Sequence, residues 1–267
     1  MGQHWTVTDT LTTELVGIEE LSVRVVGGDV VVTATDGPAH LEIAGVEKGD
    51  LEVTLADGVL VLTQDGLGDR RGLLRRIASP GPVAKILIAV PAHTRASIAT
   101  VSASILAVGL AEPADIRTVS GDVTMKDLSE RVDARTVSGD VEAFGLAGDL
   151  AVATVSGDIG IVNGTFRWLR AKTVSGDFML DLALPHGSNY SIGTVSGDVS
   201  IRFPSDPSVT VEATSMSGDM DVSFDGAPAT LRSGTRRFNG TYGSGDSRLT
   251  VKTLSGDLQI TRKEAAA

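Results

Sequence analysis

Hydrophobic and polar residues alternate along much of the chain between residues 100 and 260. Around Asp177, for example, Leu169 and Ala171 come before the aspartate and Phe178 and Leu180 come after it, with mostly polar residues between them. A period of two residues is typical of a β-strand that buries one face. No period of 3.6 residues persists through this region, so the pattern predicts strands rather than helices.

The strand pattern repeats together with the tripeptide Ser-Gly-Asp. This tripeptide occurs eight times, and its aspartates are Asp122, Asp140, Asp158, Asp177, Asp198, Asp219, Asp246 and Asp257. Successive spacings are 18, 18, 19, 21 and 21 residues up to Asp219, and the 38 residues from Asp219 to Asp257 are twice 19. Asp246 falls outside this register, inside the segment expected to hold the missing unit. A period of about 20 residues is typical of solenoids. The predicted fold is therefore all-β, a β-solenoid of stacked short strands with 18–21 residues per coil.

Each Ser-Gly-Asp separates two half-strands and is expected to form a corner or bulge. Glycine tolerates positive φ, and an aspartate side chain can accept hydrogen bonds from nearby backbone amides. In stacked coils the equivalent aspartates would form a structural turn ladder about 4.8 Å apart. The predicted ladder consists of Asp122, Asp140, Asp158, Asp177, Asp198, Asp219 and Asp257.

The residues before each corner predict two further rows. Thr118, Thr136, Thr154, Thr173 and Thr194 would stack, and their hydroxyls could hydrogen-bond along the stack. The valine that follows each of them interrupts the simple alternation. Either the corner flips the face at that position, or the sheet buries both of its sides.

The chain divides into three parts. Residues 1–95 are strand-like but irregular and are expected to cap the first coil, residues 96–262 form the repeats, and residues 263–267 form a tail. A cap is expected because the end of a solenoid exposes apolar surface and free strand edges.

Composition narrows the classes of function. The 267 residues include only 4% aromatic side chains, so the interior must consist of Val, Leu, Ile, Ala and Thr. The formal net charge of −11 would repel a phosphate backbone, which argues against a nucleic-acid partner. There are no cysteines, so disulfides and thiolate metal sites are excluded.

An arginine cluster stands out in this acidic chain. Arg70, Arg71, Arg75 and Arg76 lie in a stretch flanked by glycine and ended by proline. A solvated loop is the simpler interpretation. The alternative is a patch for an anionic partner, such as lipid headgroups at a membrane surface or an acidic protein.

The N-terminus lacks the basic start and apolar run of a signal peptide, and no stretch reaches the roughly 18 apolar residues of a membrane span. We therefore expect a cytoplasmic protein, with peripheral membrane contact left open. Its oligomeric state is also open.

Enzyme motifs are absent from the sequence. The four histidines, His4, His40, His93 and His186, are scattered, and there is no H-E-x-x-H pair, G-x-S-x-G elbow or phosphate-binding glycine loop. We expect neither catalysis nor a cofactor. Cation binding by the aspartate ladder is the alternative to turn capping, although calcium needs six to eight oxygen ligands and each coil offers one aspartate.

The repeated T-V-S-G-D-V, the middle Val90-Pro91 and the closing Y-G-S-G-D…T-L-S-G-D-L resemble a bacterial family of β-strand-repeat proteins of unknown function. Its members are often labelled "putative adhesin" and are related to the toastrack domains of envelope-stress systems. The resemblance implies a β-solenoid or stacked-hairpin fold without assigned catalytic residues, and a scaffold or sensor role. The adhesin label assumes display outside the cell, for which this sequence shows no export signal.

Two functions follow as hypotheses. The first is a non-catalytic scaffold or protein-interaction module, in envelope-stress signalling if the resemblance extends that far. The second is a cation- or glycan-binding, adhesin-like surface protein.

Overall fold

The computed structural model describes residues 2–46, 50–64, 83–203, 206–223, 229–231 and 236–262. The described residues form β-strands joined by turns and contain no helix, so the all-β prediction is confirmed. None of them therefore belongs to a helix long and apolar enough to cross a membrane. The chain forms two compact units, residues 1–136 and 137–267. Arg70, Arg71, Arg75 and Arg76 lie outside the described residues.

The N-terminal unit is organised around two long strands that run parallel to each other. β3 (Glu20–Ala34) pairs with β8 (Arg95–Val108) from Glu20 opposite Arg95 to Thr33 opposite Val108. β6 and β7 also pair in parallel with β3. The pairs β5–β6, β1–β5, β4–β7 and β2–β4 are antiparallel. Strands that follow β8 add in parallel. The remaining strands of this unit are β1 (Gln3–Val7), β2 (Leu11–Leu15), β4 (Ala39–Ala44), β5 (Leu51–Ala56), β6 (Val59–Gln64), β7 (Val83–Val90), β9 (Ala114–Arg117), β10 (Val123–Lys126) and β11 (Arg131–Arg135).

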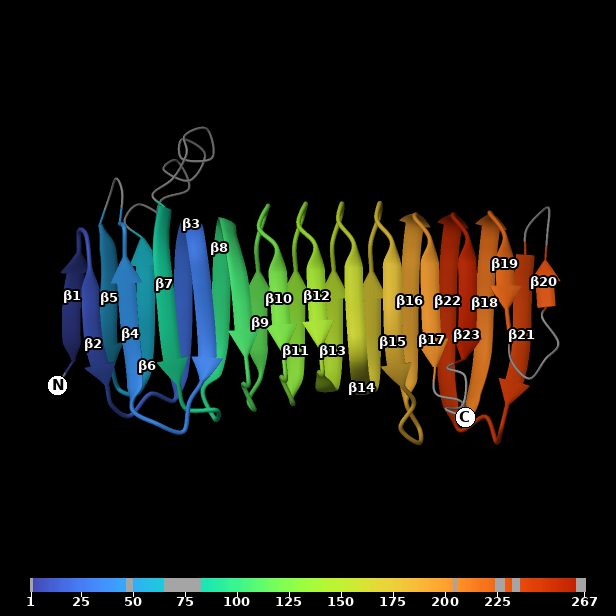
Figure 1. Ribbon diagram of the computed structural model, residues 1–267, viewed down its shortest axis with the longest axis horizontal. Coiled ribbons are helices and arrows are strands. Elements are labelled where there is room, and N and C mark those ends of the chain that lie inside the picture. Colours follow the sequence, from blue (N-terminus) through green and yellow to red (C-terminus); the bar gives the residue numbers. More distant parts are fainter. Residues whose placement is uncertain are drawn as a thin grey trace, which may run out of the picture. The chain divides into compact units, whose positions relative to one another are not determined.

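The C-terminal unit contains two ladders of mostly parallel strands, one on each side of the Ser-Gly-Asp corners (Figure 1). Val141 of β12 lies opposite Ile159 of β14, and Ile159 lies opposite Phe178 of β15, so equivalent residues of successive repeats are direct neighbours. The strands of this unit are β12 (Val141–Phe144), β13 (Ala147–Ala153), β14 (Ile159–Lys172), β15 (Phe178–Ala183), β16 (Asn189–Ser196), β17 (Val199–Phe203), β18 (Val209–Ser217), β19 (Met220–Val222), β20 (Ala229–Leu231), β21 (Arg236–Tyr242), β22 (Ser247–Ser255) and β23 (Leu258–Arg262).

The last repeat in the sequence is not the last repeat in the stack. β22 pairs in parallel with both β16 and β18, and β23 pairs in parallel with both β17 and β19. The repeat around Asp257 therefore lies between the repeats around Asp198 and Asp219, as the order of the strands in Figure 1 shows. The residues described between Asp219 and Asp257 do not form the further coil that was expected there. Instead, β21 and β20 run antiparallel to β18 and β19, and this reversal brings the chain back past Asp219.

The interior of the C-terminal unit is filled by the alternating apolar residues that the pattern predicted. Leu169, Ala171, Phe178 and Leu180 are all buried. Aromatic side chains also lie in the interior. Among the largest fully buried side chains are Phe166, Phe178, Tyr190 and Phe203. The expectation of a core without aromatic residues was therefore wrong in this unit.

The valine before each corner does not break the alternation. Ala171 and Thr173 are buried, whereas Val174 is 46% exposed, so the inward positions continue through the threonine and the valine points outward. Burial on both sides of the sheet is therefore wrong at this position. The structure instead places an apolar side chain on the surface.

Candidate functional site

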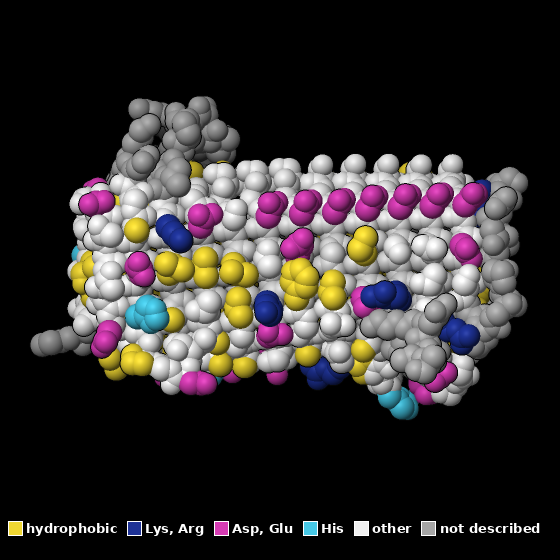
Figure 2. Space-filling model, viewed as in Figure 1, with side chains coloured by type: hydrophobic (Ala, Val, Ile, Leu, Met, Phe, Trp, Pro, Cys, Tyr) yellow, Lys and Arg dark blue, Asp and Glu magenta, His cyan; other side chains and the backbone are white. Residues whose placement is uncertain are grey.

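The Ser-Gly-Asp corners of the C-terminal unit form one continuous surface. Each of six repeats contributes an apolar residue, a serine, a glycine and an aspartate, and we call these residues the corner surface. In stacking order they are 137–140, 155–158, 174–177, 195–198, 254–257 and 216–219. Figure 2 shows acidic side chains gathered in a row along one edge of the molecular surface.

The aspartates of the corner surface are linked through backbone amides. The amide of Asp158 donates to Oδ1 of Asp140, and the amide of Asp177 donates to Oδ1 of Asp158, both at 2.8 Å. The same contact continues through Asp198, Asp257 and Asp219, at 2.6–2.8 Å. Neighbouring corner amides, such as those of Gly176 and Phe178, donate to backbone carbonyls of the next repeat. The carboxylate thus supplies the acceptor for the one corner amide that has no carbonyl opposite it.

The glycines of the corner surface allow the repeats to approach closely. A Cβ placed on Gly157, Gly176, Gly197, Gly218 or Gly256 would lie 2.0–2.3 Å from the carbonyl oxygen of a glycine in the neighbouring repeat. This close approach explains the need for glycine better than a positive φ does, because Gly176 makes the same approach without a φ in the left-handed region. A side chain at this position would force adjacent repeats apart.

The aspartate row ends at an arginine. Asp219 lies in the last repeat of the stack, and its Oδ1 is 3.3 Å from Nη2 of Arg236 on β21. The Arg236 side chain is only 8% exposed. A buried cation thus faces the carboxylate that has no further repeat beyond it.

The threonines that precede the corners are buried, but their hydroxyls do not form a continuous hydrogen-bonded ladder. In the N-terminal unit the hydroxyl of Thr100 donates to that of Thr118 at 2.8 Å. In the C-terminal unit the buried hydroxyls of Thr173, Thr194 and Thr253 have no hydrogen-bond partner among the described residues. The expectation of hydroxyl bonding along the whole stack was therefore wrong for these residues.

The apolar row of the corner surface is exposed along its whole length. Its side chains are between 44% and 56% exposed, and they are Val137, Val155, Val174, Val195, Leu254 and Met216. Contiguous exposed apolar groups of this kind are typical of interaction surfaces. In each repeat the serine and the glycine separate this apolar residue from the aspartate, so the apolar row runs beside the aspartate row.

A shallow groove of about 420 Å³ follows the other side of the aspartate row. It is lined by Asp140, Asp158, Asp177 and Asp198 of the row and by Glu142, Met179 and Ser200, each of which comes two residues after one of these aspartates. Gly160 leaves open space in the groove, because nothing lies within 4 Å of the position a Cβ would take there. The groove is lined by five carboxylates and by no lysine or arginine.

Asp122, a predicted ladder position, and Asp246, which was predicted to fall outside the ladder, need separate description. Asp122 belongs to the N-terminal unit, where its carbonyl accepts the amide of Ile105 at 2.9 Å and its side chain is exposed. Asp246, which is off the sequence register, also lies off the aspartate row.

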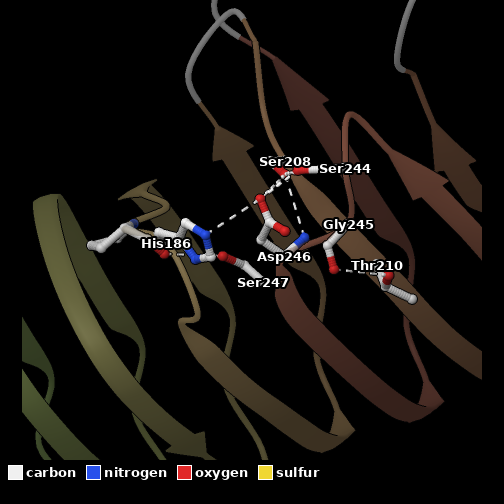
Figure 3. A network of polar contacts seen from close by, with 8 residues as sticks. His186, Ser208, Thr210, Ser244, Gly245, Asp246 and Ser247 are labelled. Carbon is white, nitrogen blue, oxygen red and sulfur yellow. Dashed lines mark hydrogen bonds and ion pairs between the residues drawn. The ribbon is translucent and has the colours of Figure 1, made fainter.

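Asp246 belongs to a separate network of loop residues in the C-terminal unit (Figure 3). Its carboxylate accepts hydrogen bonds from the hydroxyls of Ser244 and Ser208, and it lies 3.8 Å from Nε2 of His186. The Ser244 hydroxyl, followed by the charge of His186, holds the pKa of Asp246 below its ordinary value.

This serine, histidine and aspartate set differs from a hydrolase triad. Activation of a serine requires that its hydroxyl contact the imidazole. Within the described residues the imidazole of His186 contacts the carboxylate of Asp246 and neither serine hydroxyl. The network therefore ties together three loops, those around His186, Ser208 and Asp246.

One corner was missed in the sequence. Gly28-Asp29 in β3 lies opposite Ala103-Ser104 in β8, which is the position of Gly-Asp in the other repeats. A Cβ on Gly28 would lie 2.0 Å from the carbonyl oxygen of Ala84. The segment Val26-Gly27-Gly28-Asp29-Val30 differs from Val-Ser-Gly-Asp-Val only in its first glycine, so a search that tolerated one substitution would have found it.

Metal binding has no preformed site in the described residues. They contain no group of three or more His, Asp or Glu side chains placed to hold a metal ion. The aspartates of the row lie one per repeat, and each except Asp219 uses one oxygen for an amide of the next repeat.

These features define an all-β protein built from parallel repeats that meet at a shared polar and apolar corner. The chain belongs to the Toastrack DUF4097 family, whose model matches residues 15–261. Comparison with curated proteins gives no match.

The chain is similar to several solved structures, of which the first supports the fold. A "putative adhesin" from Bacteroides fragilis NCTC 9343 superposes with a TM-score of 0.50 at 15% identity, covering 96% of this chain and 98% of that one. A "putative lipid binding protein" from Parabacteroides distasonis ATCC 8503 gives a TM-score of 0.45 at 13% identity, covering 96% and 97%. A "putative cell adhesion protein" from Clostridium sporogenes ATCC 15579 gives 0.29 at 12% identity, covering 98% and 100%.

Proposed function

We propose that this protein is a non-catalytic β-solenoid scaffold, with coils of about 18–21 residues, that binds a protein partner through its corner surface. The observation that carries the proposal is the exposed apolar row. Val155, Val174 and Val195 occupy equivalent outward positions and are 44–48% exposed. A residue that faces water at or beyond the end of a strand is ordinarily polar, and here six successive repeats of the stack carry Val, Leu or Met.

The rigidity of the corner supports a binding role. The amides and glycines of neighbouring repeats fix the spacing of the row, so a partner would lose little free energy in ordering this surface. The printed names of two structural relatives refer to adhesion, which fits a binding module. If the envelope-stress resemblance extends to this chain, the partner would be a component of such a system.

The experiment is affinity capture with two matched double variants. Val155→Ser with Val174→Ser changes the apolar row, and Val16→Ser with Val162→Ser changes two exposed valines elsewhere. We expect proteins captured by the unchanged chain to be lost with the first pair and retained with the second. Equal capture by both pairs, at unchanged melting temperature, would contradict the proposal.

A cation- or glycan-binding surface is the second candidate, and the exposed carboxylate row is the observation that favours it. If cations bridge the row, millimolar calcium should raise the melting temperature and a chelator should lower it. An identical melting curve in both conditions would exclude calcium binding. A glycan array would test directly whether the surface binds sugars.

A further inference from the structure

The corner surface presents two parallel rows of unlike chemistry. In each of its six repeats an exposed apolar side chain and an exposed aspartate are separated by a serine and a glycine. The two rows therefore follow the same stacking direction, with the same spacing of roughly 4.8 Å per repeat. A ligand that matches one row along its length also lies beside the other.

The aspartate row carries charge that the protein itself does not neutralise. Asp158, Asp177, Asp198 and Asp257 form no ion pair with a described residue, and each uses only Oδ1 for the amide of the next repeat. Neighbouring carboxylates about 5 Å apart repel each other by roughly 1 kcal/mol in water. A cationic ligand would relieve this repulsion, whereas an anionic ligand would increase it.

The length and spacing of the rows fit an α-helix. Six repeats span about 24 Å, which is the length of about 16 helical residues. A helix lying along the stack presents a side chain on the same face about every 5.4 Å, so about five helical positions face the six repeats and the offset grows by only about 0.6 Å per repeat. A β-strand presents one every 6.6–6.8 Å and leaves register after one or two repeats.

We infer that the corner surface binds a basic amphipathic α-helix of a partner protein, with its leucine-like face on the apolar row and its lysine or arginine flank on the aspartate row. This inference rests on the proposed function and specifies the chemistry of its partner. The groove beside the row provides space for the long basic side chains, because the Cβ position of Gly160 is open, and Glu142 adds a further carboxylate to its lining.

The first experiment uses a synthetic 18-residue helical peptide with leucines on one face and arginines on the flank. A second peptide in which every arginine is replaced by glutamate is the control. We expect the basic peptide to bind in fluorescence anisotropy, with affinity that falls as salt rises. Its helical circular dichroism should increase on binding. The acidic peptide should not bind.

A charge-matched pair of triple variants distinguishes binding at the aspartate row from non-specific attraction to an acidic protein. Asp158→Asn, Asp177→Asn and Asp198→Asn remove three charges from the row. Glu42→Gln, Asp206→Asn and Glu212→Gln remove three exposed charges elsewhere. Asparagine retains Oδ1 as an acceptor, so the row variant should keep its melting temperature. We expect its affinity for the basic peptide to fall about tenfold, equivalent to about 1.4 kcal/mol, while the control variant changes less than about twofold.

Two results would overturn the inference: equal loss of affinity in both triple variants, or a peptide that binds without gaining helicity. Neither result would affect the capture experiment with the serine variants. If those variants still lose a partner while the basic peptide fails to bind, the scaffold function stands and the partner has another chemistry.

Discussion

The amide of Asp177 donates a 2.8 Å hydrogen bond to the Asp158 carboxylate, one repeat away. From Asp140 to Asp257 along the row, the side chain of each aspartate thus completes the backbone pairing of the next repeat. The charge of the carboxylate is not needed for this contact, but an acceptor oxygen is.

Asp158→Ala should therefore lower the free energy of unfolding by about 1 kcal/mol, because the amide of Asp177 loses its acceptor. Asp158→Asn should leave it within about 0.5 kcal/mol of the original, since Asn retains the acceptor and removes a repulsion. Urea denaturation of the two variants measures the difference. A larger loss for Asn than for Ala would show that the charge itself stabilises the row.

Gly176→Ala should destabilise the protein by about 3 kcal/mol, because its Cβ would lie 2.0 Å from the carbonyl oxygen of Gly157. Gly160→Ala is the matched control, since its Cβ would meet open space and should change stability by less than about 0.5 kcal/mol. Thermal melting compares them. For the same reason Gly157→Val should cost more than Asp158→Asn, and similar losses for this pair would contradict the close-approach explanation.

Thr173→Val should stabilise the protein by about 1 kcal/mol, because valine replaces a buried hydroxyl that has no partner with a methyl group of similar size. Thr100→Val should instead destabilise the protein, since it removes the hydroxyl that donates to Thr118 at 2.8 Å. Chemical denaturation of both variants tests the two signs. Destabilisation in both would mean that the hydroxyl of Thr173 has a partner in solution.

The loop network around Asp246 should contribute stability that depends on pH. The pKa of Asp246 is lowered in the folded protein, so its contribution is complete above the ordinary aspartate value of about 3.9 and is lost as pH falls below it. The melting temperature of Asp246→Asn should thus lie below that of the unchanged chain at pH 6, and the gap should narrow toward pH 3. A gap independent of pH would contradict this explanation.

Removal of the last repeat should affect strands on both of its sides. A chain ending at Asp246 lacks β22 and β23, which pair with β16 and β17 on one side and with β18 and β19 on the other. We expect loss of amide-exchange protection in all four of those strands. A chain ending at Arg262 is the control and should keep its protection. Loss confined to β18 and β19 would contradict the inserted position.

The sequence was informative where the structure follows local rules. The two-residue alternation located the buried faces around Asp177, and the spacing of Ser-Gly-Asp identified which residues become neighbours in the stack. These features depend on the strand geometry of each repeat, which is encoded within about 20 residues.

The order of the repeats could not be read in the same way. The corner at Asp257 has the same Ser-Gly-Asp as those at Asp198 and Asp219, preceded in each by an apolar residue, so its sequence fits any place in the stack. Its position is decided by the antiparallel return of β21 along β18, a long-range contact that has no repeat signature. The outward direction of Val174 was also ambiguous, because an apolar residue at an exposed position looks like a core residue.

The inserted final repeat has a consequence for the order of events during synthesis. A ribosome releases Asp219 and its flanking strands before the residues that will separate them from β16 and β17. Growth by simple addition of each new coil to the previous one must therefore stop at Phe203. The segment from Val209 to Val222 has to wait, or pair transiently with the wrong neighbour, until the chain is translated almost to its end.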